Sequence, residues 1–508
     1  MPTTPITFLL IVLFSGSALS QQAPIRRAEL SASHLQPETF YYNVLITGKK
    51  VGWMRQSIKR TKFEGVNAYA LEGEFVQKLL NEGKELKTTS FDVEYFSAEK
   101  PYQFLGGSTK SAQNGFQSAT EIVRSDEPEG GFIAKISSGR AQREKDLGEM
   151  DYTLGDVMAD AVWCEENPDV GDSIRVRELD FTDLEIRAAS NTLVEKFPMD
   201  GVGVIERCGL KARYVIDYDD PVGKISGKFI CDATGNMLSG DISGAVSIEL
   251  TTRDDALKLE ANLDLFESTL IKIDQSLGDP MEVTELVLEI SGASAAVIKN
   301  SANQSAEYDA KAEHLLLKIG REHGTKARVT EDARETALEE TSAYPTKDAQ
   351  IIALTERAIG RATRPKAKIK RLVDFVDTFI VDDTSSEPLS VNDIIDTQRG
   401  DCTEHSQLFV TMARAAGIPA RMVSGFIYGE ASTYCFGGHA WCEVEVDGHW
   451  HPVDPTWGET MINATHIRIS GDRPSAQEME VYLGGLKLRV LSVTDKNGNR
   501  REFAKPSK

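Results

Sequence analysis

The sequence predicts an α+β fold, with an antiparallel β-rich region first and a smaller mixed domain after it. Residues 38–292 hold short runs of alternating apolar and polar residues, separated by Gly, Asn and Asp clusters. This is the pattern of antiparallel strands. From residue 346 onward, apolar residues recur every three or four positions, as in helices. The chain of 508 residues is long enough for about three domains.

Residues 1–20 are typical of a signal peptide. They carry no charged side chain, hold an apolar run at 8–14 and end in small residues, which predicts cleavage before Gln21. An uncleaved membrane anchor is the alternative interpretation, but the run is shorter than the ~20 apolar residues of a membrane span. We therefore expect an exported protein, periplasmic or secreted, that contacts a membrane only if this segment stays uncleaved.

Strands account for most of the region 38–292. The clearest are expected at 41–46, 68–76, 88–96, 131–137, 213–217 and 245–252, with one helix near 155–163. A hairpin turning at 219–221 could bring Cys208 and Cys231 face to face, although sequence does not fix the pairing. No catalytic constellation stands out, so we interpret the region as an accessory part that binds or positions something. A polar linker with one strand near 315–319 is expected over 293–344.

Charge and cysteine content limit the partners and the scaffold. The chain has 57 Lys and Arg against 78 Asp and Glu, a formal charge of −21. Such a field repels a phosphate backbone, so nucleic acid is not an expected partner, and solubility is the simplest role of the charge. Six cysteines are too few for disulfides to be the main scaffold of a chain of this length.

A C-terminal domain is expected over 345–470, with 471–508 as an extension. It begins with two amphipathic helices, one capped by Thr346 and one at 367–380. Their apolar stripes indicate ordinary core elements.

A cysteine then opens a third helix. Cys402 follows Gly400, apolar residues keep helical spacing after it, and Gly417-Ile418-Pro419 ends the helix. A sulfur at a helix N-terminus lies near unpaired amide N–H groups and the positive end of the helix dipole. These favour a thiolate and could stabilise an oxyanion. Cys402 is therefore the candidate nucleophile; the simpler alternative is a small buried hydrophobe.

A hairpin further along is predicted to bring His439 and Asp454 together. Asp447-Gly448 is a two-residue turn signal after a strand at 421–427, and it pairs residue 446 with 449. In that register His439 and Asp454 share one face as diagonal neighbours, within side-chain reach. An imidazole held by a carboxylate is the orienting half of a catalytic triad. The simpler alternatives are a core histidine and a turn aspartate.

Several segments resemble the transglutaminase-like superfamily. They are Gly400-x-Cys402-x-Glu404, the stretch Arg414-Ala415-x-Gly417-Ile418-Pro419-Ala420-Arg421, His439-Ala440-Trp441, Asp454-Pro455-Thr456-Trp457 and, as in bacterial members, Asn463-Ala464-Thr465-His466-Ile467. The resemblance covers 345–470 and implies a papain-like domain. It further implies that Cys402 is the nucleophile, His439 the base and Asp454 the orienting acid, acting on a protein or peptide. We expect no cofactor and no metal.

The implied chemistry is acyl transfer through a Cys402 thioester, on a glutamine side chain or a peptide bond. An amine acceptor gives a transglutaminase, and water gives a protease or amidase. A degenerate domain that only binds, within the cell envelope, is the alternative outside enzymes. Trp441 and Trp457 either line a groove for the acyl donor or belong to the core.

Other residues near these segments are left open. Gln398 is the candidate for a second oxyanion donor, and the calcium-binding segments of animal members are not recognisable. Cys435, Cys442, His449 and His451 lack the dense spacing of a zinc site. His405, one turn into the third helix, is not assigned.

Overall fold

The protein is described from a computed structural model. It covers residues 23–503 except 82–83, 114–115, 126–129, 139–140, 182–183, 199–204, 221–224, 243–245, 261–262, 265–269, 293–294, 326, 342, 384–388, 431–433, 472–480 and 482–485. The chain divides into two compact units, Pro2–Leu265 and Phe266–Lys508. The predicted signal peptide lies outside the described residues. No helix in the described part of the chain is long and apolar enough to span a membrane.

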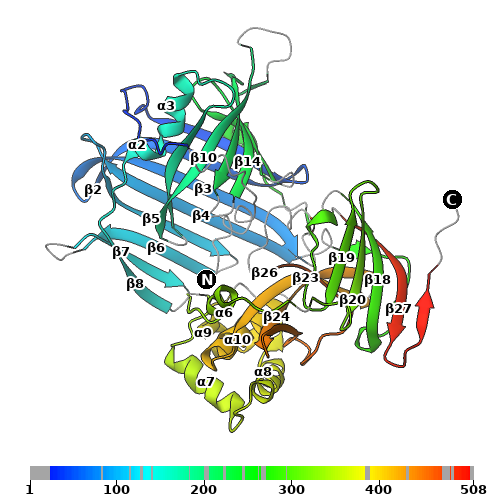
Figure 1. Cartoon of the computed structure of the whole chain (residues 1–508). Coiled ribbons are helices and arrows are strands. Elements are labelled where there is room, and N and C mark those ends of the chain that lie inside the picture. Colours follow the sequence, from blue (N-terminus) through cyan, green and yellow to red (C-terminus); the bar gives the residue numbers. More distant parts are fainter. Residues whose placement is uncertain are drawn as a thin grey trace. The chain divides into compact units, whose positions relative to one another are not determined.

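The N-terminal unit is built on one large antiparallel sheet (Figure 1). From one edge to the other its strands are β8 (Ala141–Gly148), β7 (Phe132–Ser138), β6 (Phe116–Arg124), β5 (Phe104–Gln113), β4 (Lys84–Ser97), β3 (Val66–Asn81), β2 (Lys49–Phe63), β1 (Glu38–Ile46), β16 (Val246–Thr251), β15 (Met237–Ile242), β14 (Ile225–Cys231), β13 (Tyr214–Asp220), β10 (Glu185–Lys196) and β9 (Ser173–Asp180). The small elements are β11 (Glu206–Arg207), β12 (Leu210–Lys211), α2 (Leu154–Val157), α3 (Ala159–Glu165) and α4 (Arg253–Ala256). Most neighbours in the sheet are also neighbours in sequence, as expected of a meander.

Turn chemistry and alternation explain why these residues form strands. Gly48 and Gly65 have φ of 77° and 85° in the turns that follow β1 and β2, a conformation that favours glycine. Along β1, Tyr42, Val44 and Ile46 are buried and alternate with less buried neighbours. The strands expected from the sequence lie in β1, β3, β4, β7, β13 and β16, and the expected helix lies in α2 and α3. The prediction of a β-rich first region is confirmed.

The Cys208–Cys231 bridge is not formed. Both residues are free thiols, Cys208 exposed and Cys231 buried. The register of the β13–β14 hairpin places Tyr214 opposite Cys231. Cys208 lies instead between the short strands β11 and β12. The roughly symmetric spacing about the turn was therefore misleading, because a second, shorter hairpin takes up the segment before β13.

The C-terminal unit has two five-stranded sheets and a group of helices. One sheet holds β17 (Ile271–Lys272), β24 (Tyr434–Val446), β23 (Ala420–Glu430) and β26 (His466–Gly471), with β25 (His449–Val453) paired to β24. The other holds β19 (Gln304–Asp309), β20 (His314–Gly320), β18 (Val283–Ser291), β27 (Lys487–Asp495) and β28 (Arg500–Glu502). The remaining elements are η2 (Pro280–Glu282), η3 (Ala295–Val297), α6 (Glu331–Thr336), α7 (Ala349–Ile359), α8 (Pro365–Phe379), β21 (Val381–Asp382), α9 (Val391–Thr397), β22 (Arg399–Gly400) and α10 (Cys402–Ala415).

Helix α10 is the centre of the helical core. Its Leu408, Phe409 and Met412 are fully buried and pack with residues of α7, α8, α9 and the β24–β25 hairpin. A second core lies between the two sheets and includes Phe426 and Phe436. The helix expected to be capped by Thr346 begins at Ala349, because the Asp348 carboxylate accepts the Gln350 amide at 2.7 Å.

The boundaries between regions differ from the sequence expectation. The chain divides after residue 265, and β18 belongs to the C-terminal unit rather than to the β-rich region ending at 292. The expected linker supplies β19 and β20, and the expected extension supplies β27 and β28. These four strands join β18 in one sheet. Pairing between segments this far apart in sequence leaves no local pattern, so spacing could not reveal it.

Candidate active site

The first turn of α10 presents Cys402. Asp401 is the N-cap, and its carboxylate accepts the Thr403 amide at 2.7 Å and takes part in a capping box with Glu404. The His405 amide donates to the Asp401 carbonyl at 3.1 Å. Of the four N-terminal amides of the helix, the Cys402 amide is the one without a partner among the described residues. It is therefore available to stabilise the oxyanion that forms on a carbonyl oxygen when the sulfur attacks that carbonyl group.

Close packing explains the glycine two residues before the cysteine. A Cβ added to Gly400 would lie 2.3 Å from Glu404 Cβ. The Glu404 carboxylate accepts the Asp401 amide at 2.9 Å and is buried. Burial, with the nearby Asp401 charge, raises the pKa of Glu404 to about 8. The Gly400-x-Cys402-x-Glu404 pattern is thus a packing unit that fixes the start of α10.

The Cys402 sulfur lies against the hairpin that carries the other candidates. The Ala440 amide, next to His439 in β24, is placed to hydrogen-bond it, and the Asp454 charge also acts on it. Burial raises the pKa of the Cys402 thiol far above its usual range, and Asp401 adds to this. The Ala440 amide and the helix N-terminus act in the opposite direction and favour the thiolate.

The predicted hairpin register is confirmed. Val446 pairs with His449 and Cys442 with Val453. His439 Nε2 lies 2.8 Å from Asp454 Oδ2, and both side chains are buried. Burial alone would raise the pKa of Asp454, but the His439 and His466 imidazoles hold it well below its usual range. Because the ionised carboxylate only accepts hydrogen bonds, His439 carries its hydrogen on Nε2, and Nδ1 is the nitrogen that can take a proton.

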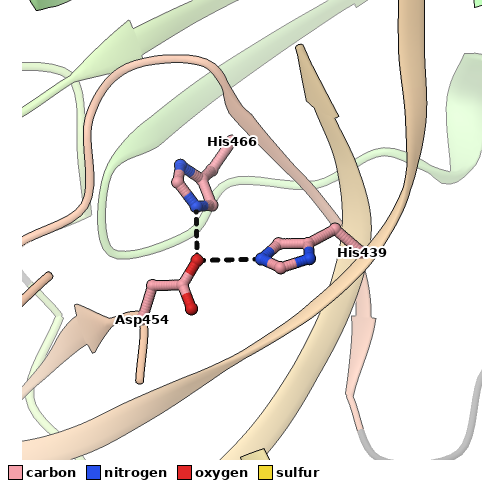
Figure 2. Close-up of side chains that lie close together, drawn as sticks. All are labelled: His439, Asp454 and His466. Carbon is pink, nitrogen blue, oxygen red and sulfur yellow. Dashed lines mark hydrogen bonds and ion pairs between the residues drawn. The ribbon is translucent and has the colours of Figure 1, made fainter. Parts of the chain in front are cut away.

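A second histidine, absent from the sequence-based candidates, meets the same carboxylate. His466 Nε2 lies 3.2 Å from Asp454 Oδ2, and its side chain is fully buried (Figure 2). The residue opens β26, opposite Ile427 of β23. The only signal in the sequence was its place in the Asn463–Ile467 segment, which gave no role to this side chain.

The two tryptophans have different surroundings. Trp441 is buried, stacks on His439 with ring centroids 5.9 Å apart, and meets His466 edge-on at 5.2 Å. Trp457 is 46% exposed and stacks on His439 at 4.5 Å. Trp441 is therefore a core residue, whereas Trp457 covers the imidazole at the surface and is placed to contact a substrate.

Arg414 and Glu443 in these segments have structural surroundings. Arg414 is buried and donates to the Ala420 carbonyl at 2.9 Å and the Glu339 carbonyl at 2.8 Å. Glu443 is buried and accepts two hydrogen bonds from Arg421. These contacts join α10 to the sheet and join β23 to β24, so they hold the elements that carry the candidates.

Several residues left open from the sequence have defined surroundings in the structure. Gln398 is exposed, with φ of 53°, and its amide caps α9 by donating to the Ile394 carbonyl. His405 is buried, with Nδ1 2.7 Å from the Asp401 carbonyl. Within the described residues, Cys435, Cys442, His449 and His451 do not form a group able to hold a metal ion.

One cluster does have the composition of a metal site. The ligand atoms of His439, Asp454 and His466 lie within 4.8 Å of one another. Two imidazoles and one carboxylate suit several transition metals. Direct hydrogen bonds already join both imidazoles to the carboxylate, however, so the geometry is complete without an ion.

A cysteine at the start of a helix, beside a hairpin that holds a hydrogen-bonded His–Asp pair, is the arrangement of papain-like cysteine enzymes. Comparison with protein families agrees: residues 352–455 match the model of the transglutaminase-like superfamily. They form a transglutaminase-like domain. This places the domain in a superfamily whose members include cysteine-based acyltransferases and proteases.

Individual relatives match only part of the chain. Kyphoscoliosis peptidase of Mus musculus is 35% identical over 83 residues, 15% of this chain and 13% of the peptidase. Protein-glutamine gamma-glutamyltransferase of Pseudomonas aeruginosa is 39% identical over 72 residues, 13% of this chain and 11% of that protein. Among solved structures, a β-barrel-like protein from Brucella abortus is 11% identical, with a TM-score of 0.31 over 43% of this chain and 95% of its own.

Proposed function

We propose that the protein is a cysteine-dependent acyl-transfer enzyme that acts on carboxamide or peptide groups, with Cys402, His439 and Asp454 as its catalytic triad. The observation that supports this most directly is the 2.8 Å contact between His439 and Asp454, beside a helix that begins at Cys402. A domain that only binds would not need a buried, ionised carboxylate hydrogen-bonded to an imidazole on the hairpin that also contacts the Cys402 thiol.

In the proposed reaction His439 acts as the base for the Cys402 thiol. As the Cys402 sulfur attacks the carbonyl carbon, its proton moves to His439 Nδ1, and the oxyanion is stabilised by the Cys402 amide. His439 then gives the proton to the leaving nitrogen, and the C–N bond breaks to leave a thioester. An amine or a water molecule then attacks the thioester carbonyl and loses a proton to His439; the C–S bond breaks, and His439 returns the proton to the sulfur, which restores the Cys402 thiol. Asp454 holds the His439 tautomer with its hydrogen on Nε2 and stabilises the imidazolium that forms during the reaction.

The acceptor in the second step distinguishes the two enzyme types. An amine acceptor makes an isopeptide bond, as the name of the glutamyltransferase relative suggests, and water makes the protein a peptidase or amidase, as the name of the other relative suggests. We favour a broad transglutaminase-like activity on an exported protein or peptide. Mass spectrometry of acyl-enzyme trapped from exported proteins, with and without a primary amine, would identify donor and acceptor.

Alkylation kinetics test the proposal without a known substrate. Because His439 takes the thiol proton as the sulfur reacts, iodoacetamide should label Cys402 faster than Cys208, an exposed free thiol of the same chain that serves as the internal reference. His439→Ala should remove this advantage and leave the labelling of Cys208 unchanged. Equal labelling of both cysteines near neutral pH, unaffected by His439→Ala, would instead favour a non-catalytic binding domain.

A further inference from the structure

The proposed mechanism leaves one buried imidazole without a role. His466 shares Asp454 Oδ2 with His439, at 3.2 Å and 2.8 Å, while Asp454 Oδ1 accepts the Thr456 amide at 2.8 Å. Figure 2 shows both imidazoles directed at the same carboxylate oxygen. A buried histidine next to a catalytic carboxylate affects both the position of that carboxylate and the electric field around it.

The other ring nitrogen of His466 also faces an acceptor. Nδ1 lies 3.3 Å from the Asn463 carbonyl, which can only accept a hydrogen bond. The ionised Asp454 carboxylate on the opposite side of the ring can only accept as well. A neutral imidazole has one N–H and would leave one of these contacts between two acceptors. With a hydrogen on each nitrogen, the ring satisfies both, and it is then a cation.

A set of hydrogen bonds among Asp454, Glu459, Asn463 and His466, here called the brace, closes the segment between Asp454 and His466. The backbones of Asp454 and Glu459 exchange two hydrogen bonds of 2.8 Å. The buried Glu459 carboxylate accepts both the backbone amide and the side-chain amide of Asn463 at 2.9 Å. Asn463 in turn presents its carbonyl to His466, which returns to Asp454. The brace holds the imidazole in place, so its contact with the carboxylate does not depend on a mobile side chain.

We propose that His466 is a positioning residue, protonated on both nitrogens, that acts as the cationic partner of Asp454 and sets the pH range in which His439 works. This inference rests on the proposed function. It assigns His466 a task separate from that of the triad: without the His466 cation, the full charge of Asp454 would act on His439 alone.

The titratable groups around Asp454 and the Cys402–His439 pair come from several elements. They are Cys402, Asp401 and Glu404 of the α10 start, Asp377 of α8, and Glu459 of the brace. Apart from the thiol, all of them are carboxyl groups, and burial raises the pKa of Glu459 and of Asp377. Removing the His466 cation therefore leaves the Cys402–His439 pair in a more negative field. Such a field favours retaining protons, so the apparent pKa values of the pair should rise.

The test measures alkylation of Cys402 against pH, in EDTA, for the wild type and two variants. His466→Gln keeps a neutral N–H donor at the position of Nε2, whereas His466→Leu keeps neither donor nor charge. In both variants the pH of half-maximal labelling should rise by about one unit, because one nearby positive charge is lost. The maximal rate should stay within a few-fold in His466→Gln and fall about 10- to 100-fold in His466→Leu, where Asp454 loses its second donor.

The matched control is His451→Gln, which changes an exposed histidine of β25 and should leave both the rate and the pH profile unaltered. If the wild type labels quickly and depends on His439, but His466→Gln does not move the profile, the cationic role of His466 is refuted and the proposed function stands. If the wild type shows no advantage over Cys208, the proposed function itself fails.

A measurement on the unmodified protein covers the case in which a variant does not fold. Long-range ¹H–¹⁵N spectra of histidine-labelled wild type separate singly from doubly protonated rings. We expect both nitrogens of His466 to show the protonated shift at pH 7, and His439 to be protonated on Nε2 alone. An unprotonated nitrogen on His466 at that pH would overturn the inference.

Discussion

The Asp454→Asn substitution is the sharpest test of the orienting carboxylate. Asp454 accepts three hydrogen bonds, from the Thr456 amide to Oδ1 and from His439 and His466 to Oδ2. An asparagine has one acceptor oxygen and one NH₂ donor. If its oxygen keeps the Thr456 amide, its NH₂ group meets two imidazole nitrogens. His439 must then move its hydrogen to Nδ1, the nitrogen that the mechanism needs as a base.

The magnitude follows from this change of tautomer. In a Ser-His-Asp triad, the same substitution lowers kcat by about 10⁴-fold. A thiol is more acidic than a hydroxyl and depends less on its base, so we expect Cys402 alkylation in Asp454→Asn to fall about 10²–10³-fold. Asp447→Asn is the matched control, because it removes an exposed carboxylate from the turn of the same hairpin, where φ of 54° suits asparagine.

The assay compares the labelling rates of Cys402 and Cys208 in each variant, with circular dichroism to confirm folding. Asp454→Asn should slow only Cys402, and Asp447→Asn should slow neither. A folded Asp454→Asn protein that labels at the wild-type rate would refute the triad. Stability gives a second readout. The pKa of Asp454 is held below its unfolded value of about 3.9, so its stabilising contribution is complete above that pH and is lost as the pH falls further. Asp454→Asn should lack this acid-dependent part.

Further predictions concern the surroundings of the triad. Glu404 has its pKa raised to about 8, so its ionisation costs stability as the pH rises from about 4 towards 8; Glu404→Gln should raise the unfolding free energy at pH 8 by about 1–2 kcal/mol, and an unchanged denaturation midpoint would contradict this. Gly400→Ala places a Cβ 2.3 Å from Glu404 Cβ and should cost about 1–3 kcal/mol in urea titrations; a smaller loss would mean that α10 can shift. Trp457→Ala removes the exposed ring stacked on His439 and should raise KM for a peptide donor more than it lowers kcat; an effect on kcat alone would exclude substrate contact. N-terminal sequencing of exported protein should begin at Gln21, and a retained Met1 would favour an anchor.

The strands and helices were predictable because their signals are local. The alternation in β1, the spacing on α8 and the Asp447-Gly448 turn each depend on residues within one element or one hairpin. The His439–Asp454 contact followed from the same turn, since a two-residue connection fixes which residues face each other. The helix start made Cys402 a candidate nucleophile, and the resemblance of several separated segments to a known family supported that assignment.

Other features depend on pairing or burial that spacing does not encode. The joining of β18 with β27 links residues that are far apart in sequence, and so the domain boundary was placed too late. Burial raises the pKa of the Cys402 thiol, and how much protein surrounds a side chain is not encoded in local spacing.

The sequence by itself determined that a cysteine begins a helix and that a histidine and an aspartate meet on a hairpin, because helix starts and tight turns are set by neighbouring residues. Only the tertiary structure decided that His466 joins that aspartate. This contact requires the start of β26 to pair with β23 and the brace after Asp454 to close, and both depend on the folded arrangement of several strands.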